Sequence, residues 1–434
     1  MSQLSSKEPR ILVVSNNPVS QIDNNGKTLS SFFSIFSNKN VAQLYFSDEM
    51  PNGAAINNFF KISDLDIIKS LLRRKYQCGT KISLTDLTKY HSNLKRCLLH
   101  ELTNLKKFES ARFVRELAWN SGKWNTLQLN SWLDIFNPEL IFFCAGDSAF
   151  AYDIVEYIQR RYCCKLVIYI TDDYILPRKT ASPIWWLRRN YLLKKMEHIV
   201  HKADLFFTIS PNMKKEYKKL FNKDSTVIMN IVDCLYRANA GGLKSSLILV
   251  YAGGLHYKRY RPLRLLGKAI KDYNDKNNKK KAFLKIYSTQ PINRKLQALI
   301  TIEGASKFCG GLSWDKLKSV LMETDILVHV ESFDKRSIES TKLSISTKIP
   351  EYLSLGKPIF AVGPREVASI QYIQDASLCV SNPNEISIYL TRLLDDPNLR
   401  DALSRKALEK YERFHKKERV QNEFRAKIIE LFQA

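Results

Sequence analysis

Short runs of apolar residues alternate along the chain with longer segments whose apolar positions recur every three or four residues. Such runs are typical of strands buried on both faces of a parallel sheet, and the segments between them are typical of crossover helices. The pattern therefore predicts an α/β protein with doubly wound parallel sheets. The predicted strands are 11–15, 41–47, 140–145, 165–171, 205–210 and 225–230 in the first half, and 247–253, 282–288, 326–331, 358–363 and 377–381 in the second. Helical patterns occupy 313–322 and 385–394, and one charged amphipathic helix is expected from about 399 to 432.

A small, polar stretch at 237–246 separates the two sets of strands and is the expected domain boundary. We expect a Rossmann-like N-terminal domain over 1–236, a Rossmann-like C-terminal domain over 247–410, and a final helix over 411–434 that packs back on the N-terminal domain. Ligands of such sheets bind beyond the carboxyl ends of the strands, which predicts a site in a cleft between facing domains. The segment at about 59–136 shows little strand signal and is interpreted as a helical, basic insertion, either a solvated cap or a surface for a membrane or acceptor.

The net charge adds one constraint. A formal charge of +25 and a pI of about 9.6 predict an anionic partner: nucleic acid, an anionic membrane face or a phosphorylated substrate. No stretch is apolar enough to span a bilayer, and the N-terminus lacks the apolar core of a secretory signal. The eight cysteines are scattered without the paired spacing of a zinc site. We therefore expect a cytoplasmic protein.

The most informative segment is STKIPEYLSLGKPIFAVGP at 346–364. Its pattern predicts a loop, a short helix, a glycine C-cap at Gly356 and a buried strand. The start of a helix offers N–H groups to a phosphate, and a carboxylate in its first turn, Glu351, can accept hydrogen bonds from a ribose diol. Taken alone, Glu351 could also be a helix-capping carboxylate.

This segment closely resembles the nucleotide-sugar motif of retaining glycosyltransferases with the GT-B fold, especially family 4 (glycosyl transferases group 1) of bacterial polysaccharide and capsule synthesis. The resemblance is strongest over about 205–361. It implies a metal-independent, retaining transfer from a nucleotide sugar, with a lean to UDP, and no cofactor. Glu351 then resembles the ribose-binding carboxylate, and Lys348 resembles a basic residue at the donor diphosphate. Ile349 lies beside them in the same motif and is included among the donor-binding candidates.

A second motif, VYAGGLHYKRY, leads from a predicted strand into a glycine pair and a basic loop. Gly253 and Gly254 would let backbone amides approach a phosphate closely. In the resembled family a basic residue here neutralises the leaving diphosphate, which makes Arg259 the first choice and Lys258 the second. His256, in the same loop, is a candidate for a donor contact.

Further candidates also follow from the resemblance. Gly310 and Gly311 occupy the place where the nucleobase packs, and Glu331 ends a strand that points into the cleft. In the first domain, the loop after the first strand resembles the glycine loop that approaches donor and acceptor. Gly26 is the better candidate there, because an ordinary loop explains Lys27 equally well.

Two departures from the family pattern affect the expected chemistry. Leu343 replaces the first glutamate of a Glu–x7–Glu pattern, so the contact to the donor sugar must come from elsewhere, either the Ser344 region or Glu331. A histidine that many members carry after the strand at 165–171 is replaced by Asp172. The adjacent acids are not interpreted as a metal site, because no other ligands cluster with them. The expected catalytic residues are Asp172, Arg259 and Lys348.

The expected acceptor is a lipid-linked glycan of cell-surface polysaccharide synthesis, with the protein bound peripherally to the inner face of the plasma membrane. Trp185 and Trp186 beside basic residues suit the headgroup interface, although core packing is an equal alternative. The alternative function is a non-catalytic homologue that binds a sugar or a lipid-linked glycan, suggested by the two departures. A nucleic-acid partner is not expected, because no recognition helix, RNP-like pattern or zinc module accompanies the charge.

Overall fold

The computed structural model describes residues 8–20, 24–52, 55–73, 75–82, 109–236, 246–277 and 281–433. The chain divides into two compact units, which are described separately. Unit 1 comprises Met1–Ile228 and Gln421–Ala434, and unit 2 comprises Met229–Val420.

Unit 1 is built on a sheet with the strand order β4-β3-β2-β1-β5-β6-β7-β8. Neighbouring strands are parallel except that β4 runs antiparallel to β3. The strands are β1 Ile11–Ser15, β2 Val41–Tyr45, β3 Asn58–Lys61, β4 Thr80–Ile82, β5 Leu140–Ala145, β6 Lys165–Ile170, β7 Leu205–Thr208 and β8 Thr226–Val227. The helices are α1 Asn24–Phe33, α2 Asp64–Leu72, α5 Glu109–Trp119, α6 Leu127–Phe136, α7 Ala149–Tyr162, α8 Pro183–Lys202 and α9 Pro211–Phe221.

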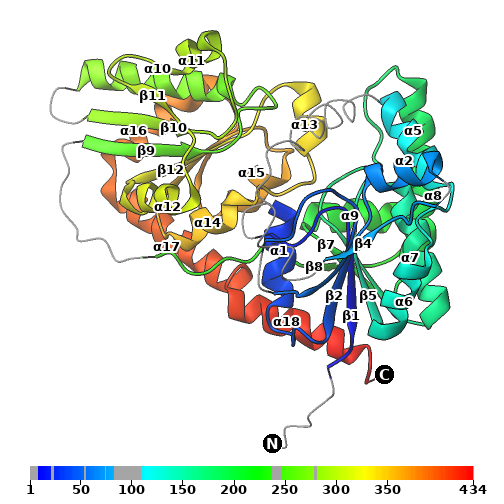
Figure 1. The fold of residues 1–434 in the computed structure, drawn as a ribbon. Coiled ribbons are helices and arrows are strands. Elements are labelled where there is room, and N and C mark those ends of the chain that lie inside the picture. Colours follow the sequence, from blue (N-terminus) through cyan, green and yellow to red (C-terminus); the bar gives the residue numbers. More distant parts are fainter. Residues whose placement is uncertain are drawn as a thin grey trace, which may run out of the picture. The chain divides into compact units, whose positions relative to one another are not determined.

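The C-terminal segment of the chain is part of the core of unit 1. Figure 1 shows α18 (Lys417–Glu430) on the same side of this sheet as α1, with α6 and α7 on the other. Phe424 is fully buried, and its ring stacks on Phe32 with centroids 5.0 Å apart. It also lies 5.6 Å from Phe142 of β5 and 6.0 Å from Phe207 of β7. The final helix therefore contributes a central aromatic side chain to the core of a sheet whose strands lie about 200 to 400 residues earlier in the sequence.

Unit 2 is built on a wholly parallel sheet with the order β11-β10-β9-β12-β13-β14. Figure 1 shows α10 and α11 on one face of this sheet and α12 and α14 on the other. The strands are β9 Ser246–Ala252, β10 Lys281–Tyr287, β11 Ser306–Gly310, β12 Ile326–Val330, β13 Ile359–Val362 and β14 Leu378–Val380. The helices are α10 Tyr260–Lys276, α11 Arg294–Ile300, α12 Trp314–Glu323, α13 Lys335–Thr341, α14 Lys348–Ser354, α15 Ala368–Ile373, the 3-10 helix η1 Pro383–Glu385, α16 Ile386–Asp395 and α17 Pro397–Phe414.

These sheets confirm the predicted α/β class, with strands close to each predicted run. The structure adds β3 and β4 within the segment that was interpreted as helical, and it adds β11, which ends at Gly310. The expected boundary at 237–246 lies outside the described residues, apart from residue 246 at the start of β9. The division between the units falls earlier, between Ile228 and Met229.

The prediction of a single helix over 399–432 is wrong, because the helical conformation is interrupted at His415, between α17 and α18. The imidazole of His415 is fully buried, with Nδ1 2.7 Å from the Asn230 carbonyl and Nε2 2.8 Å from Tyr372 Oη. The backbone carbonyl of His415 accepts a hydrogen bond from Val232 N at 3.2 Å. These tertiary contacts hold the chain in a non-helical conformation that helical periodicity cannot reveal.

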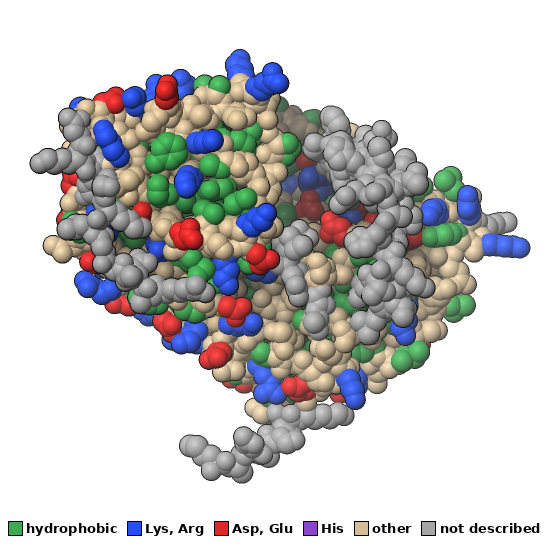
Figure 2. Space-filling view, turned by 60° about the vertical axis from the view of Figure 1, so that its left-hand side comes forward, with side chains coloured by type: hydrophobic (Ala, Val, Ile, Leu, Met, Phe, Trp, Pro, Cys, Tyr) green, Lys and Arg blue, Asp and Glu red, His purple; other side chains and the backbone are tan. Residues whose placement is uncertain are grey.

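Within the described residues, no helix combines the length and apolar character needed to cross a membrane. Figure 2 shows Lys and Arg side chains spread over the visible face rather than gathered in one patch. The net positive charge therefore does not by itself identify a binding surface on that face.

Candidate active site

The basic loop after β9 is a tight turn at the carboxyl edge of the unit 2 sheet. Tyr257 and Lys258 both have left-handed backbone conformations, with φ of 58° and 59°. Such a conformation costs roughly 1–2 kcal/mol for each non-glycine residue. Two ion pairs help to stabilise the turn: Lys258 Nζ lies 2.5 Å from Asp334, and Arg259 contacts Glu331.

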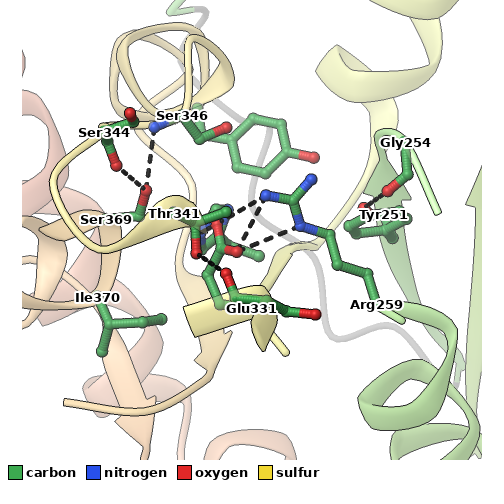
Figure 3. A network of polar contacts seen from close by, with 12 residues as sticks. Tyr251, Gly254, Arg259, Glu331, Thr341, Ser344, Ser346, Ser369 and Ile370 are labelled. Atoms are coloured by element: carbon green, nitrogen blue, oxygen red, sulfur yellow. Dashed lines mark hydrogen bonds and ion pairs between the residues drawn. The ribbon is translucent and has the colours of Figure 1, made fainter. Parts of the chain in front are cut away.

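Arg259 forms the most buried of these ion pairs (Figure 3). Its Nε and Nη2 donate to both oxygens of Glu331, over distances of 2.9–3.2 Å. The Glu331 side chain is 2% exposed and that of Arg259 is 13% exposed. Burial raises the pKa of Glu331, but His329 and the charge of Arg259 outweigh it, so the pKa lies below its usual range.

His256 lies over the glycine pair. A Cβ placed on Gly254 would come within 2.3 Å of the His256 ring, so only glycine allows the ring to lie there. His256 Nε2 is 3.2 Å from Arg259 Nη1. Burial, then the charges of Arg259 and Lys348, lower the pKa of His256, which favours the neutral imidazole next to the guanidinium.

The glycine-loop amides are mostly engaged within the protein. Gly253 N donates to the Tyr287 carbonyl at 2.9 Å, and the amides of Leu255 and His256 donate to Gln290 Oε1 at 2.8 and 2.9 Å. These three N–H groups are therefore unavailable to a phosphate. What the loop offers an anion is chiefly the side chain of Arg259.

Lys348 is a second cation beside the glycine loop. A Cβ on Gly253 would lie 3.4 Å from Lys348 Cε, so the lysine stem passes over the glycine loop. Among the described residues, no carboxylate lies within ion-pair distance of Lys348 Nζ. Burial lowers the pKa of Lys348 and the charge of Arg259 lowers it further, against the attraction of Glu351 and Glu331. The half-buried Lys348 ammonium thus lies beside a like charge and has no ion-pair partner in the part of the chain that the structure describes.

Three hydrogen bonds fix the helix and the loop that carry Lys348. Tyr352 of α14 accepts a hydrogen bond from Ala252 N at 3.1 Å, which fixes the short helix to the end of β9. Ser369 Oγ accepts from Ser346 N at 3.0 Å and donates to the Ser344 carbonyl at 3.3 Å, which ties down the loop before α14 (Figure 3). The helix has seven residues, and its Ile349 N–H already donates to the Ser346 carbonyl at 3.0 Å. The cation, rather than the helix N-terminus, is therefore the feature that can receive an anion.

The other unit 2 candidates lie around this cluster. Gly310 ends β11 in a left-handed conformation, with φ of 77°, and its carbonyl accepts from Ser288 N at 3.0 Å. Gly311 packs against Thr289, immediately before the Gln290 side chain that holds the glycine loop. Glu351 is half-buried in the first turn of α14.

Two predicted residues have their side chains in the core rather than facing solvent. Leu343, at the place of the missing glutamate, is 3% exposed, and Ile349 is 1% exposed. Sequence reasoning missed Gln290, Tyr352, Ser369 and Asp334. These residues act through contacts with distant segments, and no local motif marks them.

Asp172 and Gly26 belong to unit 1. Asp172 follows β6, and burial together with the Asp172 charge raises the pKa of Cys144, near the end of β5, to about 12. The neighbouring Asp173 accepts from Ile175 N, Leu176 N and Tyr217 Oη at 3.0–3.2 Å, so it stabilises the loop.

Gly26 lies in the first turn of α1, which corrects its expected position in a loop. A Cβ on Gly26 would come within 2.7 Å of the Pro18 carbonyl oxygen, so the close approach of helix and loop requires glycine. Among the described residues, no group of three or more His, Cys, Asp or Glu side chains could hold a metal ion.

Comparison with solved structures identifies the architecture. HepE from Anabaena, solved in complex with UDP-glucose, has a TM-score of 0.58 at 10% identity, covering 96% of this chain and 99% of HepE. An α,α-trehalose-phosphate synthase (UDP-forming) from Burkholderia xenovorans, in complex with glucose-6-phosphate, has a TM-score of 0.58 at 11% identity, covering 96% and 100%. A glycosyltransferase from Rickettsia africae has a TM-score of 0.58 at 12% identity, covering 97% and 99%.

The chain therefore has the GT-B fold, with two Rossmann-like sheets and C-terminal helices. No protein-family model matches the sequence, and comparison with curated proteins finds no match. At identities of 10–12%, the likeness establishes the fold and leaves the chemistry to be argued from the site.

Proposed function

We propose that this protein is a glycosyltransferase that binds the diphosphate of a nucleotide sugar at Arg259 and Lys348. The observation that carries the proposal is the pair of converging cations, of which Lys348 has no ion-pair partner among the described residues. Two like charges held together destabilise the empty site, and a ligand with two adjacent negative charges would relieve that repulsion. A nucleoside diphosphate is such a ligand. HepE, of the same fold, was solved with UDP-glucose, which favours a uridine nucleotide as the first to test.

In the proposed reaction, Arg259 and Lys348 stabilise the charge that develops as the sugar–phosphate bond breaks. Preorganised donors aimed at such charge are typically worth about 3–4 kcal/mol each. Glu351 would accept hydrogen bonds from the ribose, and the carboxylate of Asp172 would act near the reacting carbon. By the sequence resemblance the transfer is of the retaining, family 4 type, without a metal.

The test compares Arg259 with its neighbour. Arg259→Ala should lower kcat by roughly a hundredfold, more than it raises the donor KM, because this contact strengthens in the transition state. Lys258→Ala is the matched control, since Lys258 is held by Asp334 and should change kcat little. Release of nucleoside diphosphate from a panel of nucleotide sugars is the assay. Full activity in both variants, or no release from any donor, would refute the proposal.

We also propose a lipid-linked acceptor, reached from a membrane surface. Helix α5 packs against both α2 and α8 in unit 1, and all three carry exposed apolar side chains. These are Ile68, Leu71, Leu72, Val114, Leu117, Ile184 and Leu187. Exposed cations accompany them at Lys69, Arg73, Lys75 and Lys194. Apolar side chains flanked by cations suit an anionic bilayer. The Trp185 and Trp186 rings pack edge-to-face and are partly buried, so Ile184 and Leu187 are the more exposed residues here.

Sedimentation with anionic vesicles tests this surface. The wild type should bind at low salt and be largely released at about 0.5 M salt, where screening shortens the electrostatic reach to a few ångströms. Leu72→Asp with Leu117→Asp should reduce binding several-fold. Ile388→Asp, at a residue of unit 2 that is 69% exposed, is the matched control. If the double variant and the control variant bound the vesicles equally, this surface would not be the membrane-binding site.

A further inference from the structure

The carboxylate of Glu331 is engaged by the guanidinium of Arg259. Both carboxylate oxygens accept from Arg259, and Oε1 also lies 3.3 Å from Nε2 of the buried His329. His329 Nε2 makes no hydrogen bond among the described residues, so this contact is one of proximity. With 1% of its surface exposed, Glu331 has little freedom to contact a ligand.

The contact fixes which edge of the guanidinium faces outward. Nε and Nη2 point to Glu331 (Figure 3). Nη1 lies 3.2 Å from Nε2 of His256 in the glycine loop. Nη1 carries two N–H groups. Among the described residues, His256 is its one hydrogen-bond partner, which leaves the second N–H available to an anion.

We propose that Glu331 is a positioning residue, which holds Arg259 with Nη1 towards the leaving diphosphate and does not bind the donor sugar. This inference rests on the proposed function and reassigns Glu331 from the expected sugar contact. Arginine side chains have many rotamers, and a bidentate partner selects one of them before the ligand arrives.

The role has a distinctive signature, because the charge and the geometry of Glu331 act in opposite directions on different steps. Glu331→Gln removes a negative charge beside the anion site, so inorganic pyrophosphate and UDP should bind as tightly as before or up to about tenfold more tightly. A glutamine turns an N–H towards the guanidinium, so Arg259 loses its fixed orientation. Turnover should therefore fall at least tenfold.

Calorimetry with inorganic pyrophosphate, UDP and UDP-glucose, combined with turnover on the donor that the wild type uses, tests the inference. Glu331→Asp keeps the buried charge on a shorter side chain, and it should lower turnover while leaving UDP affinity unchanged. In an Arg259→Ala background, Glu331→Gln should cause no further loss of turnover, because Glu331 acts through Arg259.

Three results would overturn the inference. Weaker UDP-glucose binding with unchanged UDP binding would make Glu331 a sugar contact. Losses that add to those of Arg259→Ala would show an independent role. Parallel loss of pyrophosphate binding and turnover would indicate a structural role alone. Wild-type protein that binds neither UDP nor pyrophosphate would refute the proposed function itself, a result distinct from these three.

Discussion

Replacement of Lys348 by methionine should stabilise the protein while weakening anion binding. Burial and the charge of Arg259 lower the pKa of Lys348, so folding disfavours its charged form relative to the unfolded chain. Methionine has a similar length and no charge. Replacement of poorly compensated buried charges by apolar side chains is often neutral or stabilising, here by about 1 kcal/mol. For a unit of this size, that raises the melting temperature by about 3 °C.

The same change removes one cation from the diphosphate. A hydrogen bond to a charged group contributes about 1.5–3 kcal/mol, so the pyrophosphate or UDP dissociation constant should rise by roughly 10- to 100-fold. At a ligand concentration of 100 times the wild-type dissociation constant, the wild type gains about 2.7 kcal/mol of stability. A variant that binds about 30-fold more weakly gains under about 1 kcal/mol.

Thermal unfolding with and without pyrophosphate measures both effects. The pH dependence follows from the lowered pKa: the cost of the charged lysine is present below the folded-state pKa and is relieved as the pH rises through it. The stability advantage of Lys348→Met should therefore shrink at alkaline pH. Lys268→Met, at an exposed lysine of α10, is the control and should change neither property. A variant that melts several degrees lower and binds pyrophosphate normally would refute this reasoning.

Three further predictions concern other parts of the molecule. Glu351→Ala should weaken UDP binding at least tenfold in calorimetry while leaving pyrophosphate binding unchanged, because the proposed contact is to the ribose; equal affinity for UDP would remove Glu351 from the site. Burial lowers the pKa of His415 to about 4. The free energy of unfolding should therefore fall by up to about 3 kcal/mol between pH 6.5 and pH 4, as the unfolded state takes up the proton first, and His415→Gln should lack this component in denaturant titrations. Phe424→Ala should destabilise unit 1 by about 3–5 kcal/mol through the cavity that it leaves; a loss below 1 kcal/mol would show that the final helix contributes little to that core.

The candidate site could be proposed from the sequence to the extent that its residues share local motifs. Lys348 and Glu351 stand in one segment, and Arg259 follows a strand and a glycine pair. The pairing of Arg259 with Glu331, 72 residues away in the chain, could not be predicted, because it depends on the register of β9 beside β12. The same holds for Gln290, which occupies the loop amides that the glycine pair was expected to offer.

The sequence by itself determined the α/β class, because strands buried on both faces must be continuously apolar and amphipathic helices must repeat every three to four residues. It also determined which segments carry cations and glycines near strand ends. Only the tertiary structure decided which cation is held and which is not. Lys258 is bound by Asp334 and Arg259 by Glu331, while Lys348 lacks a counter-ion among the described residues. Likewise, the break at His415 arises from the Asn230 and Tyr372 contacts, which outweigh a helical pattern that continues through it. The physical reason is the same in both cases: local periodicity specifies what a segment can form, whereas long-range contacts specify which of its polar groups are satisfied.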